Sequence, residues 1–417
     1  MPSLNSIMPP SDISSAQRWG WLALQIGMVT VFAALPISIA LMNAGLALAW
    51  AGALLARAPV HKTVGFWWGV AYAGWQVVSR LVGAWEGRDV GGGFGMMYTW
   101  TGLCLAQLAF GGTSAQVTRV RQIAMRLLLV TVTAAVLVAL AQFVIGHKDA
   151  AKPLRIGADG IRFKHATGFF AIHLTYGVMM MTLIILALGG ALESWSPWRW
   201  WGRVLAGIAS FGMVLSMGRL AFAGMVIGVV SLVAASGRQY FRRAAVAGLV
   251  AVAVTGLLFA LVRPERFAET LRLEDGRWPI WKTSVVMASQ HPIVGVGSSR
   301  AFRIAYLDLY DGVNPTIPNE FPKGAPHAHN TPLALVAEHG IPALILWLAL
   351  LVVVLKALHG RSASHLPAWR TGVAVVLAFL TAGLFEHLAG DGESCHALWT
   401  LLGSTLAFPS PNASPSS

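Results

Sequence analysis

Apolar runs of about 20 residues recur along nearly the whole chain and are separated by short polar turns. A run of that length is enough for a helix to cross the hydrocarbon core of a bilayer. The pattern therefore predicts about twelve transmembrane helices. We expect them near residues 20–38, 40–56, 64–84, 93–111, 123–145, 166–190, 200–217, 220–236, 243–262, 332–357, 368–387 and 394–408.

One long polar interval, from Arg263 to Gly340, interrupts this pattern. Within it, residues 277–290 have the spacing of an amphipathic helix, with tryptophans suited to the membrane interface. The predicted apolar side contains Ile280, Trp281, Val285 and Met287, and the polar side contains Lys282, Ser284 and Gln290. The fold class is thus an all-α polytopic membrane protein with one long loop outside the bilayer that contains short amphipathic helices.

The same pattern predicts four divisions of the chain. Residues 1–262 form a transmembrane bundle of about nine spans. Residues 263–331 form a loop domain that carries part of the active site, and residues 332–408 contain the last three helices. Residues 409–417, rich in Pro, Ser and Asn, are expected to be a disordered tail.

Composition agrees with a membrane protein, because 56% of the residues are hydrophobic and only 11% are charged. No soluble domain of any size fits between the apolar runs. The two cysteines, Cys104 and Cys395, lie far apart and are expected to be free, buried thiols. The polar N-terminal segment lacks the features of a cleavable signal, so we expect a cytoplasmic tail.

The distribution of Lys and Arg predicts the orientation. Fourteen of the 30 basic residues fall on one side of the predicted helices, where the only acids are Asp12 and Glu193. These basic residues are Arg18, Arg57, Lys62, Arg119, Arg121, Arg126, Arg199, Arg203, Arg238, Arg242, Arg243, Lys356, Arg361 and Arg370. By the positive-inside rule this side is cytoplasmic, and both termini lie inside.

The opposite side also carries many Lys and Arg residues that topology does not require, although its acids nearly cancel their charge. Its positive charges concentrate in residues 146–165 and in the long loop. One interpretation is a solvated surface whose Lys and Arg pair with the acids of the same side. The other is a binding surface for an anionic ligand, which the clustering in two loops favours.

Two arginines stand at predicted helix starts on this outer side. Arg219 lies between two apolar stretches, where an arginine is costly unless it is paired or faces a wet cavity. Arg277 opens the predicted amphipathic helix. The alternatives are a snorkelling arginine for Arg219 and a charge on the wet face of a surface helix for Arg277.

His329 is the sharpest candidate for proton transfer. Thr331 followed by Pro332 predicts a helix N-terminus, which places His329 just outside the helix. The positive end of that helix and nearby arginines would favour the neutral imidazole, which can accept a proton. By position alone, His327 is almost as good a candidate for proton transfer. The alternative for His329 is an ordinary surface histidine. Glu338 lies out of phase with His329 on the predicted helix, so we do not pair these two residues.

A second polar group follows the predicted span 368–387. It contains Glu386, His387, Asp391, Glu393 and His396. These residues could in principle hold a metal ion, but their irregular spacing favours a hydrogen-bonded polar turn. The sequence contains no phosphate-binding glycine loop and no nucleotide-binding signature.

Several motifs together resemble those of bacterial O-antigen ligases. His329-Asn330, nine residues and then Gly340 resemble the family signature, although Ala343 stands where the family has Gly, Thr or Tyr. Ser216-Met-Gly-Arg219 resembles the family's arginine before a central span, and Arg277 with Trp281 and residues 291–297 resembles the segment before the histidine. Residues 162–169 are similar to a less strict sequence pattern that the same family has ahead of a span. The superfamily also contains O-antigen polymerases and protein O-oligosaccharyltransferases.

This resemblance implies a glycosyltransferase of the bacterial inner membrane. Such an enzyme moves a polysaccharide from undecaprenyl pyrophosphate to a sugar hydroxyl of the lipid A core at the periplasmic face. It implies His329 as the base and Arg219 and Arg277 as partners of the diphosphate, with no cofactor and no metal. Arg162, Lys164, Arg300 and Asn330 are expected to bind substrate.

Two alternatives stay open. One is an O-antigen polymerase of the same superfamily. The other is a transporter or flippase for lipid-linked oligosaccharides, which predicts polar residues near the bilayer midplane. The predicted spans contain few such residues beyond Ser, Thr and Gln, which favours chemistry at the membrane surface.

Overall fold

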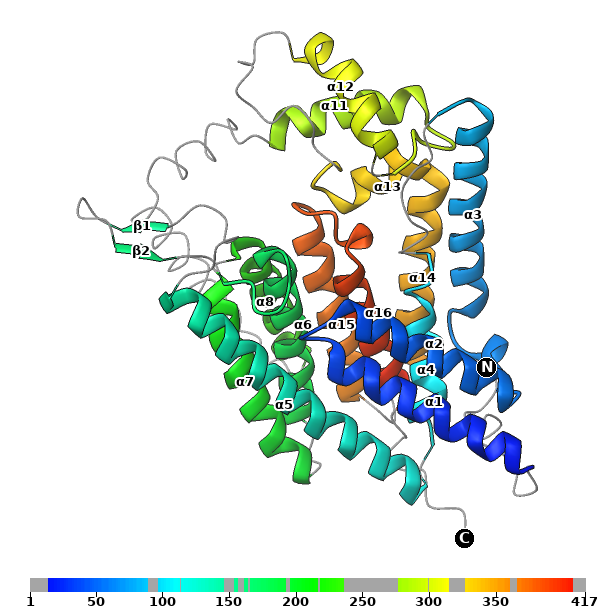
Figure 1. Ribbon diagram of the computed structural model, residues 1–417, viewed down its shortest axis with the longest axis vertical. Helices are drawn as coiled ribbons and strands as arrows, with labels where there is room; N and C mark the ends of the chain where they lie inside the picture. The colour runs from blue at the N-terminus through cyan, green and yellow to red at the C-terminus, as the bar shows by residue number, and fades with distance from the viewer. Residues whose placement is uncertain are drawn as a thin grey trace.

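The computed structural model describes residues 14–88, 97–112, 114–145, 154–156, 161–163, 166–192, 196–216, 218–235, 277–298, 300–314, 327–360 and 366–407, and every structural statement below refers to these. They are almost entirely helical (Figure 1), as the sequence predicted. The helices are α1 (Ser15–Ala34), α2 (Ile39–Leu55), α3 (Phe66–Trp85), α4 (Thr101–Phe110), α5 (Ala115–Ile145), α6 (His173–Leu192), α7 (Ser196–Ser216), α8 (Arg219–Ala234), α11 (Arg277–Gln290), α12 (Arg300–Val313), α13 (Thr331–His339), α14 (Ile341–Gly360), α15 (Leu366–Gly383) and α16 (Gly392–Ala407).

Shorter elements join these helices. Two 3₁₀ turns, η2 (Val60–Lys62) and η3 (Leu388–Gly390), lie before α3 and α16. Strands β1 (Leu154–Ile156) and β2 (Ile161–Phe163) pair in an antiparallel hairpin that the hydropathy pattern did not predict. The predicted span 243–262 and the predicted tail 409–417 lie outside the described residues.

One predicted span is wrong as a continuous helix. The apolar run 332–357 forms two helices, α13 and α14, which meet at Gly340. Gly340 has φ +82°, and a Cβ there would overlap the backbone carbonyl of Ile293. The break therefore depends on a residue without a side chain.

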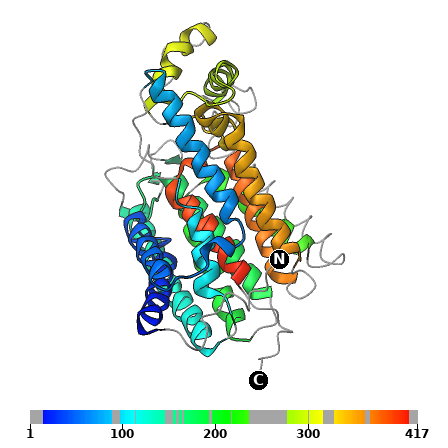
Figure 2. The same ribbon diagram turned by 90° about the vertical axis from the view of Figure 1, so that its right-hand side faces the viewer.

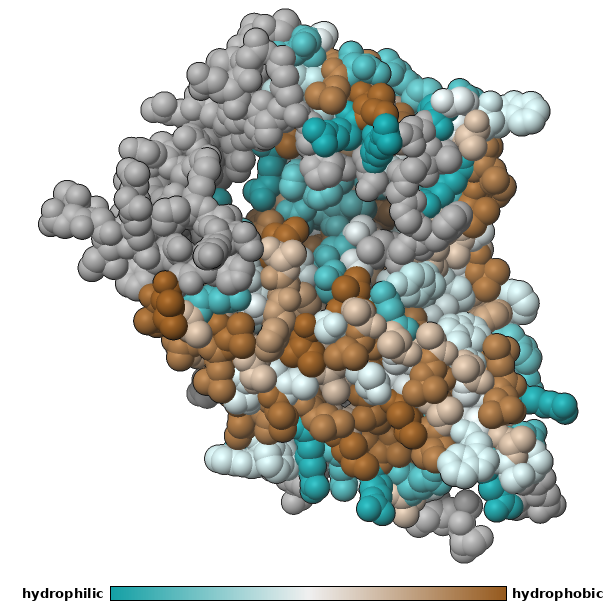
Figure 3. All heavy atoms as spheres, viewed as in Figure 1, coloured by the Kyte–Doolittle hydropathy of each residue, from teal (hydrophilic) through white to brown (hydrophobic). Residues whose placement is uncertain are grey.

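Three described helices are long and apolar enough to cross a membrane by length and composition: α5, residues 173–190 of α6, and α14. α2, α4, α8 and residues 368–383 are apolar but shorter. The surface shows a broad hydrophobic band between more hydrophilic ends (Figure 3), as expected of an integral membrane protein. The count of twelve spans stays a prediction.

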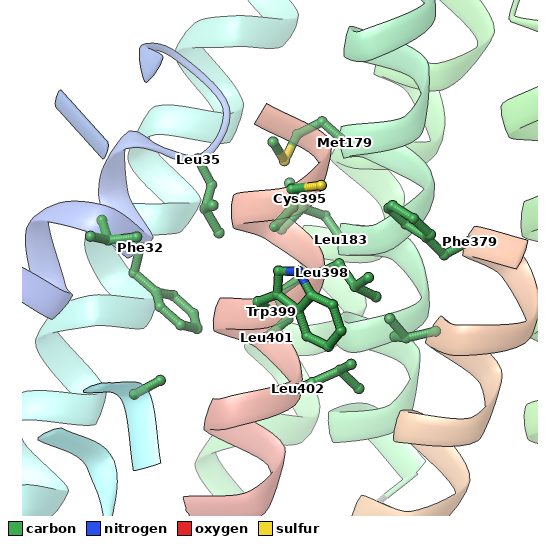
Figure 4. Close-up of a cluster of buried hydrophobic side chains, with 14 of the residues drawn as sticks. Phe32, Leu35, Met179, Leu183, Phe379, Cys395, Leu398, Trp399, Leu401 and Leu402 are labelled. Atoms are coloured by element: carbon green, nitrogen blue, oxygen red, sulfur yellow. The ribbon is translucent and has the colours of Figure 1, made fainter. Parts of the chain in front are cut away.

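The short helices α4 and α16 lie inside the bundle. Every residue of α4 is buried, and so is every residue of α16 except Glu393. Trp399 of α16 packs among side chains from α1, α6 and α15, including Phe32, Leu183 and Phe379 (Figure 4). α16 is thus a central helix around which the others pack, and both cysteines are free and buried as predicted.

Arg121 corrects one detail of the predicted loops. α5 begins at Ala115, so Arg121 lies inside a helix and is buried. Its guanidinium donates to the carbonyls of Phe110, Gly112 and Ala407. Carbonyls at helix C-termini lack helical partners and carry partial negative charge, so one arginine satisfies the ends of α4 and α16 together.

At the opposite end of these helices, α11, α12 and α13 form a cap, in which α11 packs against α12 and α13, and α13 contacts α3 and α14. α3 and α14 run side by side and reach this cap (Figure 2). A second apolar cluster of Ile280, Met287, Phe302, Tyr306 and Ala334 holds the cap together. The cap contains the candidate residues of the long loop.

Candidate functional site

The two main sequence motifs pack directly against each other. One motif is the turn at residues 291–298, and the other includes α13. In the turn, the backbone N–H of Val296 donates to the Ala337 carbonyl (2.8 Å), and that of Gly297 donates to the Glu338 carbonyl (2.9 Å). Gly295 has φ +68°, and a Cβ there would overlap the backbone of Glu338. Together with the Gly340 contact, these bonds fix the direction of α13.

α3 braces the same turn from a distant part of the sequence. Ser79 Oγ donates to the Val294 carbonyl (2.6 Å), and Trp75 Nε1 donates to the His339 carbonyl (2.8 Å). Arg80 Nη2 donates to Ser298 Oγ (3.2 Å). No sequence pattern predicts these bonds, because their partners lie more than 200 residues apart.

The predicted helix over residues 277–290 is confirmed as α11, Arg277–Gln290, but its apolar and polar residues do not separate onto the two predicted faces. Its buried face differs from the prediction at two positions. Ser284 is buried and donates to the Ile280 carbonyl (2.7 Å), whereas Val285 is 56% exposed. A serine satisfied by its own helix can face the core, so the polar label of Ser284 misled the prediction.

The loop before α13 holds His329 in an unusual conformation. His329 has φ +48°, a left-handed value that is uncommon for a residue with a side chain. Its backbone N–H donates to His327 Nδ1 (3.2 Å). The N-cap of α13 is Asn330, whose Oδ1 accepts from Leu333 N (2.9 Å), so the predicted cap at Thr331 is wrong by one residue.

Thr331 instead joins the loop to the segment after α15. Its Oγ1 donates to the Glu386 carbonyl (2.8 Å) and accepts from Leu388 N (2.8 Å). Asn330 Nδ2 donates to the Leu384 carbonyl (2.8 Å). The predicted substrate-binding residue Asn330 thus has both side-chain ends bonded to backbone, and its role toward substrate stays a prediction.

These bonds bring Glu386 against His329. His329 Nδ1 lies 3.0 Å and 3.2 Å from the two carboxylate oxygens of Glu386. His327 Nε2 lies 3.7 Å from Glu386 Oε1, and His387 N donates to the same oxygen (3.1 Å). The side chains of His329, His327 and Glu386 are 29%, 27% and 13% exposed, so solvent reaches the group from one side.

The surroundings shift two pKa values in the site. Burial alone would raise the pKa of Glu386, but the hydrogen bond from His329 and the charges of both histidines bring it to about 2. Burial lowers the pKa of His327 to about 4, helped by the neighbouring His387 and His329. The site therefore holds a carboxylate beside a neutral His327 near neutral pH.

A second histidine and carboxylate lie behind this group. His387 Nε2 is 3.5 Å from Glu338 Oε1, and both side chains are buried. The rings of His327 and His387 have centroids 5.5 Å apart. Glu338 is thus the partner of His387 and not of His329. This agrees with the prediction that Glu338 is out of phase with His329.

The structure places Arg277 and Arg219 at helix starts, as predicted. Arg277 opens α11 one turn before Trp281, whose ring lies 6.0 Å from that of Phe385, the residue before Glu386. Arg219 opens α8. α8 runs antiparallel to α15, with Gly228 against Ala374 and Gly224 against Ala378 and Ala382, so its first turn lies level with the end of α15.

The other predicted site residues are spread more widely. Arg300 is the first residue of α12 and is exposed. Arg162 lies in β2, opposite Arg155 of β1. Lys164 lies outside the described residues.

The acidic group after α15 does not form one site. Asp391 accepts a hydrogen bond from Ser394, and His396 Nε2 lies 2.9 Å from Asn43 Oδ1. Only Glu386 turns toward His329. Among the described residues, the group that could hold a metal ion is His327, His329 and Glu386.

Sequence reasoning missed Glu386 as the partner of His329. The two residues are 57 positions apart, so no local spacing connects them. One signal was available. The predicted topology put the end of the span 368–387 on the same membrane side as His329, and Glu386 is the acid at that end.

Comparison with known proteins agrees with the quoted motifs. Residues 204–348 match the family model described as O-antigen ligase. The matched segment contains Arg219, Arg277, Arg300 and His329, whereas Glu386 and α3 lie outside it. A search of curated proteins finds no match.

Proposed function

We propose that this chain, a member of the O-antigen ligase superfamily, is an O-antigen ligase. It transfers polysaccharide from undecaprenyl pyrophosphate to a sugar hydroxyl of the lipid A core. The observation that carries the proposal is the contact between His329 and Glu386 at the end of the bundle where Arg219 and Arg277 begin their helices.

His329 acts as the general base in this proposal. A carboxylate only accepts hydrogen bonds, so the contact with Glu386 assigns the proton of neutral His329 to Nδ1 and the lone pair to Nε2. His329 Nε2 then takes the proton of the acceptor hydroxyl. Glu386 orients the ring and stabilises the imidazolium that forms, as an acid does behind a catalytic histidine in other enzymes.

The reaction is a single displacement. The acceptor oxygen attacks the anomeric carbon from the side opposite the leaving group, and the bond between that carbon and the diphosphate oxygen breaks. The configuration at the anomeric carbon is inverted. The electron pair leaves with undecaprenyl pyrophosphate, and the acceptor proton ends on His329.

Arg219 and Arg277 stabilise the diphosphate. Each guanidinium offers a planar pair of N–H donors that fits two phosphate oxygens. Charge that develops on the leaving group is stabilised most by donors already fixed in place, and both arginines start helices whose positive ends favour anions. The reaction then needs no nucleotide and no metal ion.

The substrates require a periplasmic site in the inner membrane. Both are anionic lipids, which suits a basic surface beside the bilayer. Reporter fusions after Arg57, Arg121 and Arg243 should read cytoplasmic, and fusions near Lys152 and Asp308 should read periplasmic. A periplasmic signal at Arg121 would contradict the proposal.

The deciding experiment is a gel of lipopolysaccharide from a deletion strain. Loss of long bands with accumulation of lipid-linked polymer is expected for a ligase. A single repeat on the core would instead identify an O-antigen polymerase, which the family match does not separate from a ligase. Absence of any periplasmic donor would identify a flippase.

A further inference from the structure

We propose that His327, His329 and Glu386 form a binding site for a zinc ion, and that zinc bound there inhibits transfer. The binding site follows from the geometry alone. Its inhibitory effect rests on the proposed role of His329 as the base.

The three side chains already provide a suitable set of ligands. One ligand atom from each lies within 4.8 Å of those of the other two, and Glu386 Oε1 is 3.0 Å from His329 Nδ1 and 3.7 Å from His327 Nε2. Two imidazole nitrogens and one carboxylate oxygen, with a fourth position open to water, make a common zinc environment. Mg²⁺ and Ca²⁺ prefer oxygen ligands and should bind far more weakly.

The backbone around these ligands is held by bonds that zinc would not disturb. Thr331 Oγ1 bonds the backbone of Glu386 and Leu388, and the Asn330 side chain caps α13 beside His329. The partial exposure of both histidines leaves a path for the ion. A small movement of three side chains is therefore enough to form the site.

Two existing hydrogen bonds oppose the ion. His327 can bind zinc through Nε2 only if its proton moves to Nδ1, and Nδ1 now accepts from the backbone of His329 (3.2 Å). Zinc binding to His329 Nδ1 also replaces the hydrogen bond between this nitrogen and Glu386 (3.0 Å). This cost favours cations that bind imidazole strongly, such as Zn²⁺ and Cu²⁺, over weaker ones.

Zinc at this position would remove the lone pair that the reaction needs. In the proposed metal-free site, the Nδ1–H of His329 donates a hydrogen bond to Glu386, which leaves Nε2 as the proton acceptor. When Nδ1 binds zinc, the neutral ring carries its proton on Nε2 and accepts no further proton. The ion also engages Glu386, which otherwise stabilises the imidazolium.

Zinc binding can be measured without activity. Full-length protein purified without a polyhistidine tag and dialysed against EDTA is titrated with Zn²⁺ in competition with a fluorescent chelator. We expect one ion per chain, and at least about tenfold weaker affinity in His327→Ala, His329→Ala and Glu386→Gln. His61→Ala and His359→Ala, which change exposed histidines elsewhere, should bind as the parent does.

Melting temperatures of all variants show whether each is folded. Glu386→Gln keeps the size of the side chain and serves where an alanine variant fails to fold. Affinity equal to that of the parent in all three site variants would overturn the zinc site and leave the proposed function standing.

Transfer is then measured with Zn²⁺, with Mg²⁺, and with Zn²⁺ followed by EDTA. Zinc should inhibit, EDTA should restore the rate, and magnesium should have no effect. His327→Ala, compared with its own metal-free rate, should be less sensitive to zinc. Zinc bound at the three residues with unchanged turnover would remove His329 from the role of base, and zinc that increases turnover would overturn both proposals.

Discussion

His329 and His396 have very different surroundings. His396 is completely buried in α16, where its Nε2 lies 2.9 Å from the side-chain oxygen of Asn43, and Tyr98 donates to the same oxygen (2.7 Å). His329 lies in a loop, is 29% exposed and contacts the carboxylate of Glu386. Of these two histidines, His329 is the one that combines access to solvent with a charged partner.

The difference separates a structural histidine from one suited to proton transfer. An amide such as Asn43 fixes a ring but stabilises a new positive charge far less than a carboxylate does. The left-handed backbone of His329 costs on the order of 1 kcal/mol, which the surrounding bonds must offset. His396 sits in ordinary helix without such a cost.

The largest effect is expected from His329→Ala. Loss of the base should lower transfer by about 100-fold to 10,000-fold while donor binding stays nearly intact, because the base acts on the acceptor. The assay is transfer from lipid-linked donor to lipid A core, with donor binding measured separately. Weak donor binding in this variant would point to a role in the donor site instead.

His396→Ala is the matched control. It should keep the rate of the folded enzyme but lower stability by about 1–3 kcal/mol, because Asn43 loses a buried hydrogen bond. Thermal unfolding in detergent measures the stability. If His396→Ala lost the transfer rate without losing stability, both histidines would be needed for transfer, and the contrast between His329 and His396 would be wrong.

Arg219→Lys and Arg277→Lys should each reduce transfer by roughly tenfold to 100-fold. The charge remains, but an ammonium replaces two fixed N–H donors by a point charge. Arg126→Lys, on an exposed position of α5, is the control and should be close to normal. Normal activity of either site variant would remove that arginine from the diphosphate site.

Glu386→Gln should have an effect of similar size, about 10-fold to 100-fold on turnover. The amide keeps the size of the side chain but loses the charge that stabilises the imidazolium of His329.

His327→Ala should reduce transfer only mildly, because His327 is not the proposed base. A severe loss of transfer in His327→Ala together with a mild loss in His329→Ala would identify His327 as the base. Position in the sequence alone favours neither histidine clearly.

The sequence predicted most described helices because apolar runs and caps are local signals. α11 and α8 begin at Arg277 and Arg219 as expected. The break at Gly340 was missed because an apolar run across a glycine is also compatible with one helix. Its φ of +82° is required by the backbone of Ile293, a contact between distant residues.

The site was predictable only in part for the same reason. His329, Arg219 and Arg277 belong to recognisable motifs, each readable within a few residues. Glu386 follows a different helix, and Thr331, which fixes its backbone, was read only as a helix cap. Residues that position a site through long-range hydrogen bonds leave no period or spacing in the sequence.

The smallest expected effect concerns metal removal. Purified enzyme with lipid-linked donor and lipid A core should turn over in excess EDTA at close to its untreated rate, because the guanidinium groups of Arg219 and Arg277 supply the counter-charge to the diphosphate. EDTA should accelerate a preparation only if zinc occupies His327, His329 and Glu386. If EDTA stopped the reaction and magnesium or manganese restored it, the arginines would be auxiliary. If Asp391→Asn then lost transfer activity to the same extent, the active site would lie near the start of α16. The contrast between His329 and His396 would in that case not indicate where the reaction occurs.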